Sequence, residues 1–315
     1  MSEAPPGKCR EPVLVIGFNR PALMRAQIDA LRVVAPRVLY VAVDGPRPEV
    51  PDDRQAVAAS RTVVELVDWD CEVHTLFPET NVGAGAGPFG AIDWFLTSVE
   101  RGIILEDDVV ASPQFFDFAS EMLDRYEDDH RVAGITGMSL DPPAQREMLR
   151  TSYRFTSVPQ VWGWATWARS WTGVTLDISD RKQWLNLGDV SRSLHWPLML
   201  QAVIAKRIHD TATGRVRTWD AQFMSRGLAR GAMYVMPARA LTTNVGVFDK
   251  PTHPGYEPMH LRPIEPLEWP LRHPDIVGVD PLLDVPMLTA AFEATPRGYA
   301  AKAARKIRHA LGRDG

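Results

Sequence analysis

The stretch Gly102-Ile-Ile-Leu-Glu-Asp-Asp-Val109 indicates both the fold and the position of a functional site. An apolar run of strand length is typical of a strand that is covered on both faces. Similar apolar runs lie at residues 12–17 and 37–43, and a helical pattern follows each of them. The alternation of strands and helices from residue 12 to residue 136 predicts an α/β fold with a mostly parallel central sheet flanked by helices.

Composition places the chain among ordinary globular proteins. It has 315 residues, of which 45% are hydrophobic and 23% are charged. Its two cysteines exclude a disulfide framework and a four-cysteine metal site. The net charge of −4 gives no sign of nucleic-acid binding, so we expect no nucleic-acid partner. Because the sequence shows neither an apolar run of membrane-spanning length nor the apolar stretch of a signal peptide, we expect a cytoplasmic protein.

Three consecutive acids, Glu106, Asp107 and Asp108, end the buried run at 102–105. In open parallel sheets, ligands bind outside the carboxyl ends of the strands. Adjacent carboxylates raise the pKa of one another, and a divalent cation relieves that repulsion. Mg²⁺ or Mn²⁺ suits such oxygen ligands. The alternative is a solvated turn, or acids that favour the N-terminus of the next helix.

The segment Gly85-Ala-Gly87-Pro-Phe-Gly90 matches the glycine pattern of dinucleotide-binding loops between a predicted strand and a predicted helix. An oxidoreductase that binds NAD(P) or FAD is therefore an alternative function. Against it, the pattern lies in the third strand–helix unit rather than the first, and Pro88 interrupts the turn.

Four tryptophans gather at 162–171. Aromatic side chains either pack in the core or offer a flat face to a sugar. We expect Trp167 and Trp171 in the core, and leave both roles open for Trp162 and Trp164.

Several segments, taken in their order, resemble the GT-A fold glycosyltransferases that use nucleotide sugars. The chain is similar to the inverting N-acetylglucosaminyltransferase I type and to bacterial sugar-nucleotide transferases. The resemblance covers residues 12–255. Its segments are Pro12–Pro21, Val43–Pro46, Gly102–Val109, Ser112–Phe116, Trp162–Trp164, Trp219–Asp220 and Thr243–Gly246.

The resemblance implies a donor site at the strand ends. Asp108 would hold Mn²⁺ or Mg²⁺, Asp107 would contact the ribose, and Glu106 would lie close to the donor sugar. Arg20 would reach the diphosphate or the nucleoside. Asp44 would read the uracil.

The resemblance also implies a general base. Asp220, next to Trp219, would take the proton of the acceptor hydroxyl, and Trp164 would shape the pocket beyond the donor. From the sequence alone, Asp220 is equally well explained as a capping or first-turn acid of the helix that follows it.

A loop at 242–253 would close on the donor. His253 in this loop either touches the diphosphate or is an ordinary loop histidine. Gly87, in the glycine-rich stretch that begins at Asn81, would let the backbone approach the donor closely, and we expect Asn81 to bind the donor as well.

Together these observations predict a metal-dependent, inverting transferase that moves a sugar from a nucleotide sugar to an acceptor hydroxyl. We expect the donor to be a UDP-sugar. The acceptor would be a carbohydrate, a glycolipid or a small molecule. A nucleotide-sugar binder without catalysis is the other alternative. The geometry of the site is needed to decide between a transferase, an oxidoreductase and a binder.

We expect a flexible lead-in at 1–11, a GT-A catalytic domain at 12–255, a loop-rich C-terminal extension at 256–294 and a basic terminal helix at 295–315. This last segment carries six basic residues and one acid. It is explained either by peripheral contact with the inner membrane face or by a solvated or packed helix.

Overall fold

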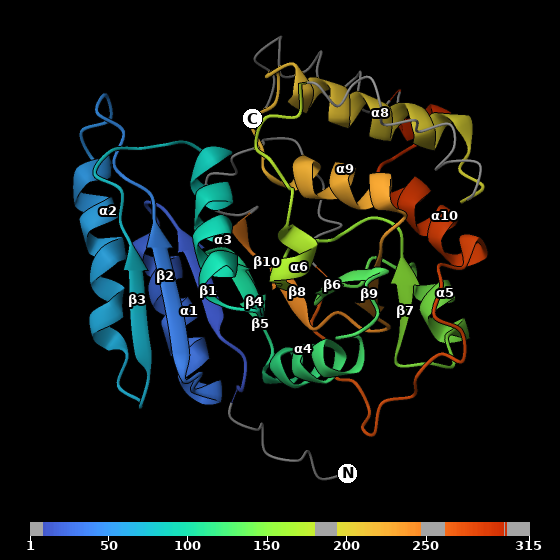
Figure 1. The fold of residues 1–315 in the computed structure, drawn as a ribbon, viewed down its shortest axis with the longest axis horizontal. Coiled ribbons are helices and arrows are strands. Elements are labelled where there is room, and N and C mark those ends of the chain that lie inside the picture. The colour runs from blue at the N-terminus through green and yellow to red at the C-terminus, as the bar shows by residue number, and fades with distance from the viewer. Residues whose placement is uncertain (1–8, 180–193, 247–261, 299, 301–315) are drawn as a thin grey trace.

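The computed structural model describes residues 9–179, 194–246, 262–298 and 300. An eight-stranded sheet in the order β3-β2-β1-β4-β8-β6-β9-β7 forms its centre (Figure 1). All strands but β8 and β7 run in one direction, which confirms the mainly parallel α/β sheet. The strands are β1 (Val13–Gly17), β2 (Val38–Val43), β3 (Glu72–Leu76), β4 (Arg101–Glu106), β6 (Val132–Thr136), β7 (Tyr153–Thr156), β8 (Trp164–Trp167) and β9 (Met233–Pro237).

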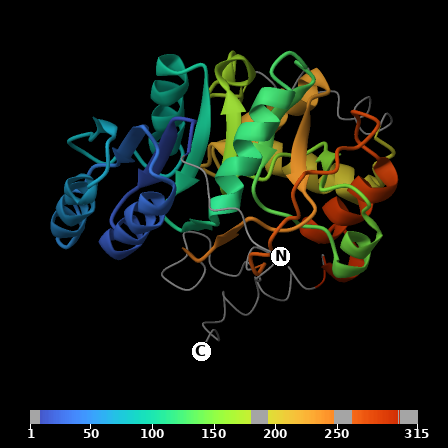
Figure 2. The same ribbon diagram turned by 90° about the horizontal axis from the view of Figure 1, so that it is seen from below.

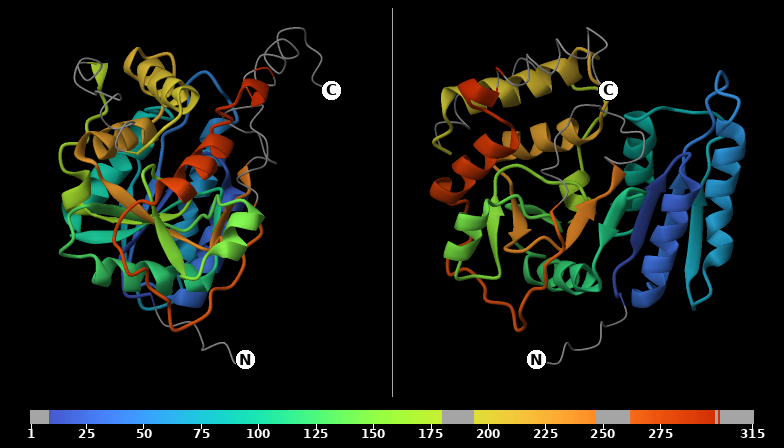
Figure 3. Two further views of the ribbon diagram at one scale, coloured as in Figure 1. Left: turned by 90° about the vertical axis from the view of Figure 1, so that its right-hand side faces the viewer. Right: turned by 180° about the vertical axis from the view of Figure 1, so that it is seen from behind.

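Helices cover both faces of this sheet (Figures 2 and 3). One face packs against α1 and α4, and the other against α3, α6 and α9. In Figure 1, α8 lies outside α9, and its apolar side chains pack on α9 and α10. The helices are α1 (Pro21–Val34), α2 (Asp53–Arg61), the 3-10 helix η1 (Thr62–Leu66), α3 (Ala86–Ser98), α4 (Pro113–Arg125), α5 (Pro143–Met148), α6 (Ala168–Trp171), α8 (Leu198–Ala212), α9 (Asp220–Arg230) and α10 (Pro281–Ala291).

Strand β1 shows why the central strands are continuous apolar runs. Val13 and Val15 belong to the core on the α1 and α4 face. Leu14 and Ile16 belong to the core on the α3 face. Each side chain is removed from water, and burying one aliphatic side chain of this size contributes roughly 1.5–3 kcal/mol. A strand with both faces covered therefore needs apolar residues at every position.

Two short strands pair outside the main sheet and bring distant segments together. Strand β5 (Val109–Ala111) directly follows the acidic triplet, and β10 (Thr242–Asn244) belongs to the segment expected to close on the donor. They pair antiparallel, with Asn244 opposite Val109. This pairing places the backbone after Asn244 beside Asp108.

The structure corrects several local expectations. The helix expected at 54–67 ends at Arg61 and continues as the 3-10 helix η1, where Thr62, Val63 and Val64 are β-branched residues with low helix propensity. Of the helix expected at 180–209 with a break at Pro197, the part after the break forms α8 with Pro197 as its N-cap residue, and residues 180–193 lie outside the described part. The extension at 256–294 contains the helix α10 as well as loops.

Of the four tryptophans at 162–171, Trp164 and Trp167 lie in the buried strand β8 and Trp171 lies in α6. Trp167 and Trp171 are 3% and 4% exposed, which confirms the expected core positions. Trp164 is also buried, whereas Trp162 is partly exposed and borders a cleft.

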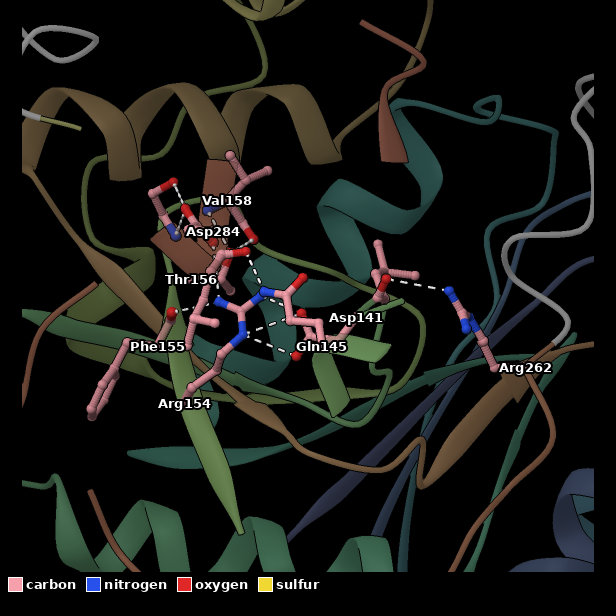
Figure 4. A network of polar contacts seen from close by, with 11 residues as sticks. Asp141, Gln145, Arg154, Phe155, Thr156, Val158, Arg262 and Asp284 are labelled. Atoms are coloured by element: carbon pink, nitrogen blue, oxygen red, sulfur yellow. Dashed lines mark hydrogen bonds and ion pairs between the residues drawn. The ribbon is translucent and has the colours of Figure 1, made fainter. Parts of the chain in front are cut away.

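A buried ion network fastens α10 to the edge of the sheet (Figure 4). The Arg154 guanidinium on β7 donates to the Asp141 carboxylate, with 2.6 Å from Nη2 to Oδ1, and to Asp284 Oδ1 on α10 at 3.3 Å. Asp284 Oδ2 also accepts the backbone N–H of Ser157 at 3.2 Å. Both carboxylate side chains are at most 1% exposed. Two buried acids therefore depend on one arginine.

No helix among the described residues is long and apolar enough to cross a membrane. The lead-in expected at 1–11 and the basic helix expected at 295–315 fall mostly outside the described residues.

Candidate functional site

A cleft of about 1000 Å³ opens at the carboxyl ends of β1, β2 and β4. This is the edge of the sheet at which the strand order predicts a ligand. It is large for a small-molecule site, since such sites commonly span roughly 300–1,000 Å³. Of the residues expected at the donor and base sites, the cleft is lined by Arg20, Asp44, Asn81, Gly87, Glu106, Asp107, Asp108, Trp219 and Asp220.

The acidic triplet lies where β4 ends. Glu106 is the last residue of β4, and Asp107 and Asp108 form the turn to β5. Arg20, directly before α1, donates from Nη1 to Asp107 Oδ1 at 3.3 Å and to Asp108 Oδ2 at 3.0 Å. Gln27, on the buried face of α1, donates to the backbone carbonyl of Glu106 at 2.7 Å and to that of Val109. Helix α1 therefore fixes both the side chains and the backbone of the turn.

Burial makes Glu106 and Asp107 costly to ionise. Burial, followed by the charges of Asp108 and Asp107, raises the pKa of Glu106 to about 8. Burial also raises the pKa of Asp107 to about 7, although the positive charge of Arg20 opposes this rise. Arg20 pairs with Asp107 and Asp108, and Glu106 adds a third carboxylate, so the turn favours an additional cation.

The segment that includes β10 also holds Asp108. Asn244 donates from Nδ2 to Asp108 Oδ1 at 3.1 Å, and its own Oδ1 accepts the backbone N–H of Gly246 at 2.8 Å. The backbone N–H of Val245 donates to the carbonyl of Asp108 at 2.7 Å. The Thr243-Asn-Val-Gly246 motif thus belongs to the acidic turn, a contact that sequence reasoning did not assign.

Among the described residues, no group of three or more histidine, cysteine, aspartate or glutamate side chains is arranged to hold a metal ion. Mg²⁺ in nucleotide sites is commonly bound by only one or two carboxylates, with water and substrate phosphates as the other ligands. The carboxylate oxygens of Asp108 and its neighbours have the donor chemistry that a cation of that kind prefers.

Asp220 is the first residue of α9 and lines the cleft, and its charge contributes to the raised pKa of Glu106. Its Oδ2 accepts from Arg207 Nη2 on α8, and its Oδ1 accepts from the Thr218 hydroxyl. Burial disfavours the charged carboxylate, but the positive charge of Arg207 and the Thr218 hydrogen bond outweigh it and lower the pKa of Asp220. Trp219, not Asp220, is the N-cap residue, so Asp220 is a first-turn acid held by side chains.

Sequence reasoning missed Arg207. It lies 13 positions before Asp220, on a different helix, and no local pattern links the two. Only the packing of α8 on α9 brings them together.

Trp219 lines the cleft next to Asp220 and packs against Trp164. The two indole rings stack with centroids 5.6 Å apart at an interplanar angle of 22°. Trp164 is 2% exposed and does not border the cleft, so it contacts the site through Trp219. His253 lies outside the described residues.

Asp44 follows β2 and is surrounded by donors from its own chain. Its Oδ1 accepts the backbone N–H groups of Gly45 at 2.7 Å and Val82 at 3.0 Å. Its Oδ2 accepts Asn81 Nδ2 at 2.8 Å and the backbone N–H of Gly83 at 3.1 Å. A carboxylate offers about four acceptor positions, and all are used here.

Two glycines of the glycine-rich loop, Gly85 and Gly87, approach protein atoms, whereas Gly90 meets none within 4 Å. A β-carbon on Gly85 would lie 3.3 Å from the backbone nitrogen of Thr218, and one on Gly87 would lie 3.2 Å from Asp44 Oδ2. These glycines let the loop pack between Asp44 and the segment before Asp220.

No protein-family model and no curated protein sequence matches the chain. Similar solved structures include UDP-glucose pyrophosphorylase complexed with UDP-glucose, with TM-score 0.37, 8% identity and coverage of 72% of this chain and 90% of that one. Mouse xyloside xylosyltransferase 1 in its apo form has TM-score 0.35 and 11% identity, with coverage of 71% and 84%. Mannose-1-phosphate geranyltransferase from Thermus thermophilus has TM-score 0.35 and 13% identity, with coverage of 77% of each chain. Similarities this low assign no activity, so the function is argued from the cleft.

Proposed function

We propose that this protein is a metal-dependent, inverting glycosyltransferase that uses a UDP-sugar donor. The observation that carries the proposal is a single cleft lined by acids from two different elements. Glu106, Asp107 and Asp108 lie at the end of β4, and Asp220 lies at the start of α9. Sugar transfer needs a cation near the leaving diphosphate and a base near the acceptor, and these two groups match those two needs.

On the donor side, Asp108 would hold Mn²⁺ or Mg²⁺ together with diphosphate oxygens. The ion, when bound, offsets the negative charge that develops on the leaving nucleoside diphosphate. Arg20, which already lies 3.0 Å from Asp108, adds a fixed positive charge on the same side. Asn244 orients the Asp108 carboxylate.

On the acceptor side, Asp220 would act as the general base. The acceptor oxygen forms its bond to the anomeric carbon while the bond from that carbon to the diphosphate oxygen breaks. The hydroxyl proton passes to Asp220, and attack from the face opposite the leaving group inverts the anomeric centre. Arg207 and Thr218 hold the carboxylate in one orientation and keep it ionised near neutral pH.

The geometry favours the transferase over a dinucleotide oxidoreductase. In a dinucleotide site, the loop glycines give the pyrophosphate access to the backbone. Here Gly85 and Gly87 give access to Thr218 and Asp44 instead.

We propose a carbohydrate, glycolipid or small molecule as the acceptor and the cytoplasm as the location.

Calorimetric titration with UDP, with and without Mn²⁺, tests the donor site. We expect Mn²⁺-dependent binding that Asp108→Asn weakens at least tenfold. Asp128→Asn, in an exposed acidic run, is the matched control and should bind as the wild type does. Stabilisation by NAD without any binding of UDP and Mn²⁺ would overturn the proposal.

Release of UDP from a panel of UDP-sugars tests catalysis. Asp220→Asn should keep the UDP affinity and lose about 10²–10⁴-fold in turnover, the usual contribution of a general base. A wild type that binds UDP-sugars but never turns them over, with carbohydrate acceptors supplied, would be a binder without catalysis.

A further inference from the structure

The residue expected to read the nucleobase is not free to do so. Asp44 lines the cleft, but its four acceptor positions are filled by Gly45, Asn81, Val82 and Gly83. A ligand N–H would have to displace one of these donors. Asp44 therefore shapes the glycine-rich loop, and base recognition needs other groups.

A second set of cleft residues lies at the same strand ends and has unused polar atoms. Phe18 and Asn19 follow β1, and Arg47 follows β2, whose last residue Val43 pairs with Gly17. All three side chains border the cleft. The Arg47 guanidinium lies over the Phe18 ring, with Cζ 5.3 Å from the ring centroid. We call Phe18, Asn19 and Arg47 the base corner.

Asp53 holds the base corner in one geometry. Its Oδ1 accepts both Asn19 Nδ2 at 2.7 Å and Arg47 Nη2 at 2.9 Å, so the amide and the guanidinium meet at one oxygen. Arg47 Nε donates to the other oxygen of the same carboxylate. The Asp53 side chain is 3% exposed, and Arg47 is 42% exposed. A buried acid thus presents a partly exposed arginine to the cleft.

Two atoms of the base corner remain available to a ligand. In the part of the chain that the structure describes, Arg47 Nη1 has no acceptor and Asn19 Oδ1 has no donor. The corner therefore offers one donor, one acceptor and a stacked aromatic and guanidinium surface. Bases are commonly bound by stacking on aromatic rings and on arginine planes.

Charge indicates a base rather than a phosphate. The positive charge of Arg47 is balanced by Asp53, whose ionised form is favoured because hydrogen bonding to Arg47 lowers its pKa to about 2. Phe18 and Asn19 are uncharged. A corner with no net charge is suited to a neutral ring. The charged diphosphate would instead lie near Arg20, which pairs with the acidic turn.

We infer that the base corner, and not Asp44, recognises the nucleobase, and that its ligand is a pyrimidine with an imide edge. The ring would stack on the Arg47 and Phe18 surface, Asn19 Oδ1 would accept the imide N–H, and Arg47 Nη1 would donate to the adjacent carbonyl. This inference rests on the proposed nucleotide-sugar function.

Calorimetry with UDP, ADP and inorganic pyrophosphate, each with Mn²⁺, tests it. Arg47→Met and Asn19→Ala should lower the affinity for UDP about tenfold to a hundredfold, on the scale of one stacked and hydrogen-bonded base. Their affinity for pyrophosphate should not change. Arg54→Met, on an exposed position of α2, is the matched control and should bind UDP as the wild type does.

Arg47→Lys separates loss of the base contact from loss of the local fold, because it keeps the charge beside Asp53 but removes the planar surface. It should keep the melting temperature and still lose discrimination between UDP and ADP. If Arg47→Met and Asn19→Ala discriminate as the wild type does while Asp44→Asn does not, the inference is wrong. A wild type that binds neither UDP nor pyrophosphate would instead overturn the proposed function.

Discussion

Gly246 and Asp108 approach each other so closely that a β-carbon on Gly246 would lie 2.1 Å from Asp108 Oδ2. Real β-carbons do not come this near to an oxygen, so any other residue must move one of the two segments. The Asp108 carboxylate has little freedom to move, because Arg20 and Asn244 hold its two oxygens. The glycine of the Thr243–Gly246 motif therefore sets the position of the proposed metal ligand.

Gly246→Ala should displace Asp108 and weaken Mn²⁺-dependent UDP binding at least tenfold, as measured by calorimetry. Gly90→Ala is the control, since a β-carbon on Gly90 of α3 would meet no atom within 4 Å. Alanine in a helix is favoured over glycine by about 1 kcal/mol, so this variant should bind UDP normally and unfold at a slightly higher temperature. Equal UDP affinities for the two variants would show that the Gly246 contact has no bearing on the site.

The strands that position the donor site could be predicted because their signal is local. Strands β1, β2 and β4 are buried on both faces, so each appears in the sequence as a continuous apolar run. Chain order then places Asp44 and the acidic triplet at one edge. Strand β8 could not be predicted in this way, because its four residues Trp-Ala-Thr-Trp do not form a continuous aliphatic run.

The residues that hold the site could not be found from sequence spacing. Arg207 reaches Asp220 only because α8 packs on α9, and Arg47 meets Asn19 only through Asp53. The saturation of Asp44 was also out of reach, since a count of its hydrogen bonds needs the course of the loop at 81–83. Side-chain positions at strand ends follow from topology, whereas the partners of those side chains follow from packing.

Arg207→Met should shift the pH dependence of turnover. Burial favours the neutral form of Asp220, and the charge of Arg207 is the largest influence that lowers its pKa. Without that charge the pKa of Asp220 rises, so the ionised base disappears at a higher pH. The acid limb of the kcat/KM profile should move up by about one to three pH units.

Lys206→Met controls for a general effect on α8, because Lys206 is exposed and pairs with Asp210 on the same helix. Its acid limb should coincide with that of the wild type. An Arg207→Met profile that falls in height without moving along the pH axis would mean that Arg207 only supports the fold.

Arg154→Met should be strongly destabilising. It leaves the buried carboxylates of Asp141 and Asp284 without their shared cation. Removing one partner of a buried ion pair costs about 3–5 kcal/mol, which urea unfolding at pH 7 would detect. Part of the loss should be recovered at lower pH, because unpaired buried carboxyls have a raised pKa and become neutral there.

The exposed pair Arg10 and Asp124 gives the comparison, with side chains 63% and 45% exposed. Arg10→Met should change the free energy of unfolding by about 1 kcal/mol or less. Similar losses for the two variants would contradict the role given to the buried network.

Asp53 should make the wild type sensitive to acid in a defined direction. Hydrogen bonding to Arg47 outweighs burial and lowers the pKa of Asp53 to about 2, from an ordinary value of about 3.9. A carboxyl with a depressed folded-state pKa stabilises the protein fully above its unfolded-state pKa, and this contribution disappears as the pH falls through the folded-state value. Between pH 5 and pH 2.5 the melting temperature of the wild type should therefore fall faster than that of Asp53→Asn, whose side chain does not titrate.

Asp52→Asn, at the exposed neighbouring position, is the control, and its melting temperature should fall with pH as steeply as that of the wild type. Parallel slopes for wild type and Asp53→Asn would show that the Arg47 clamp contributes nothing to acid stability.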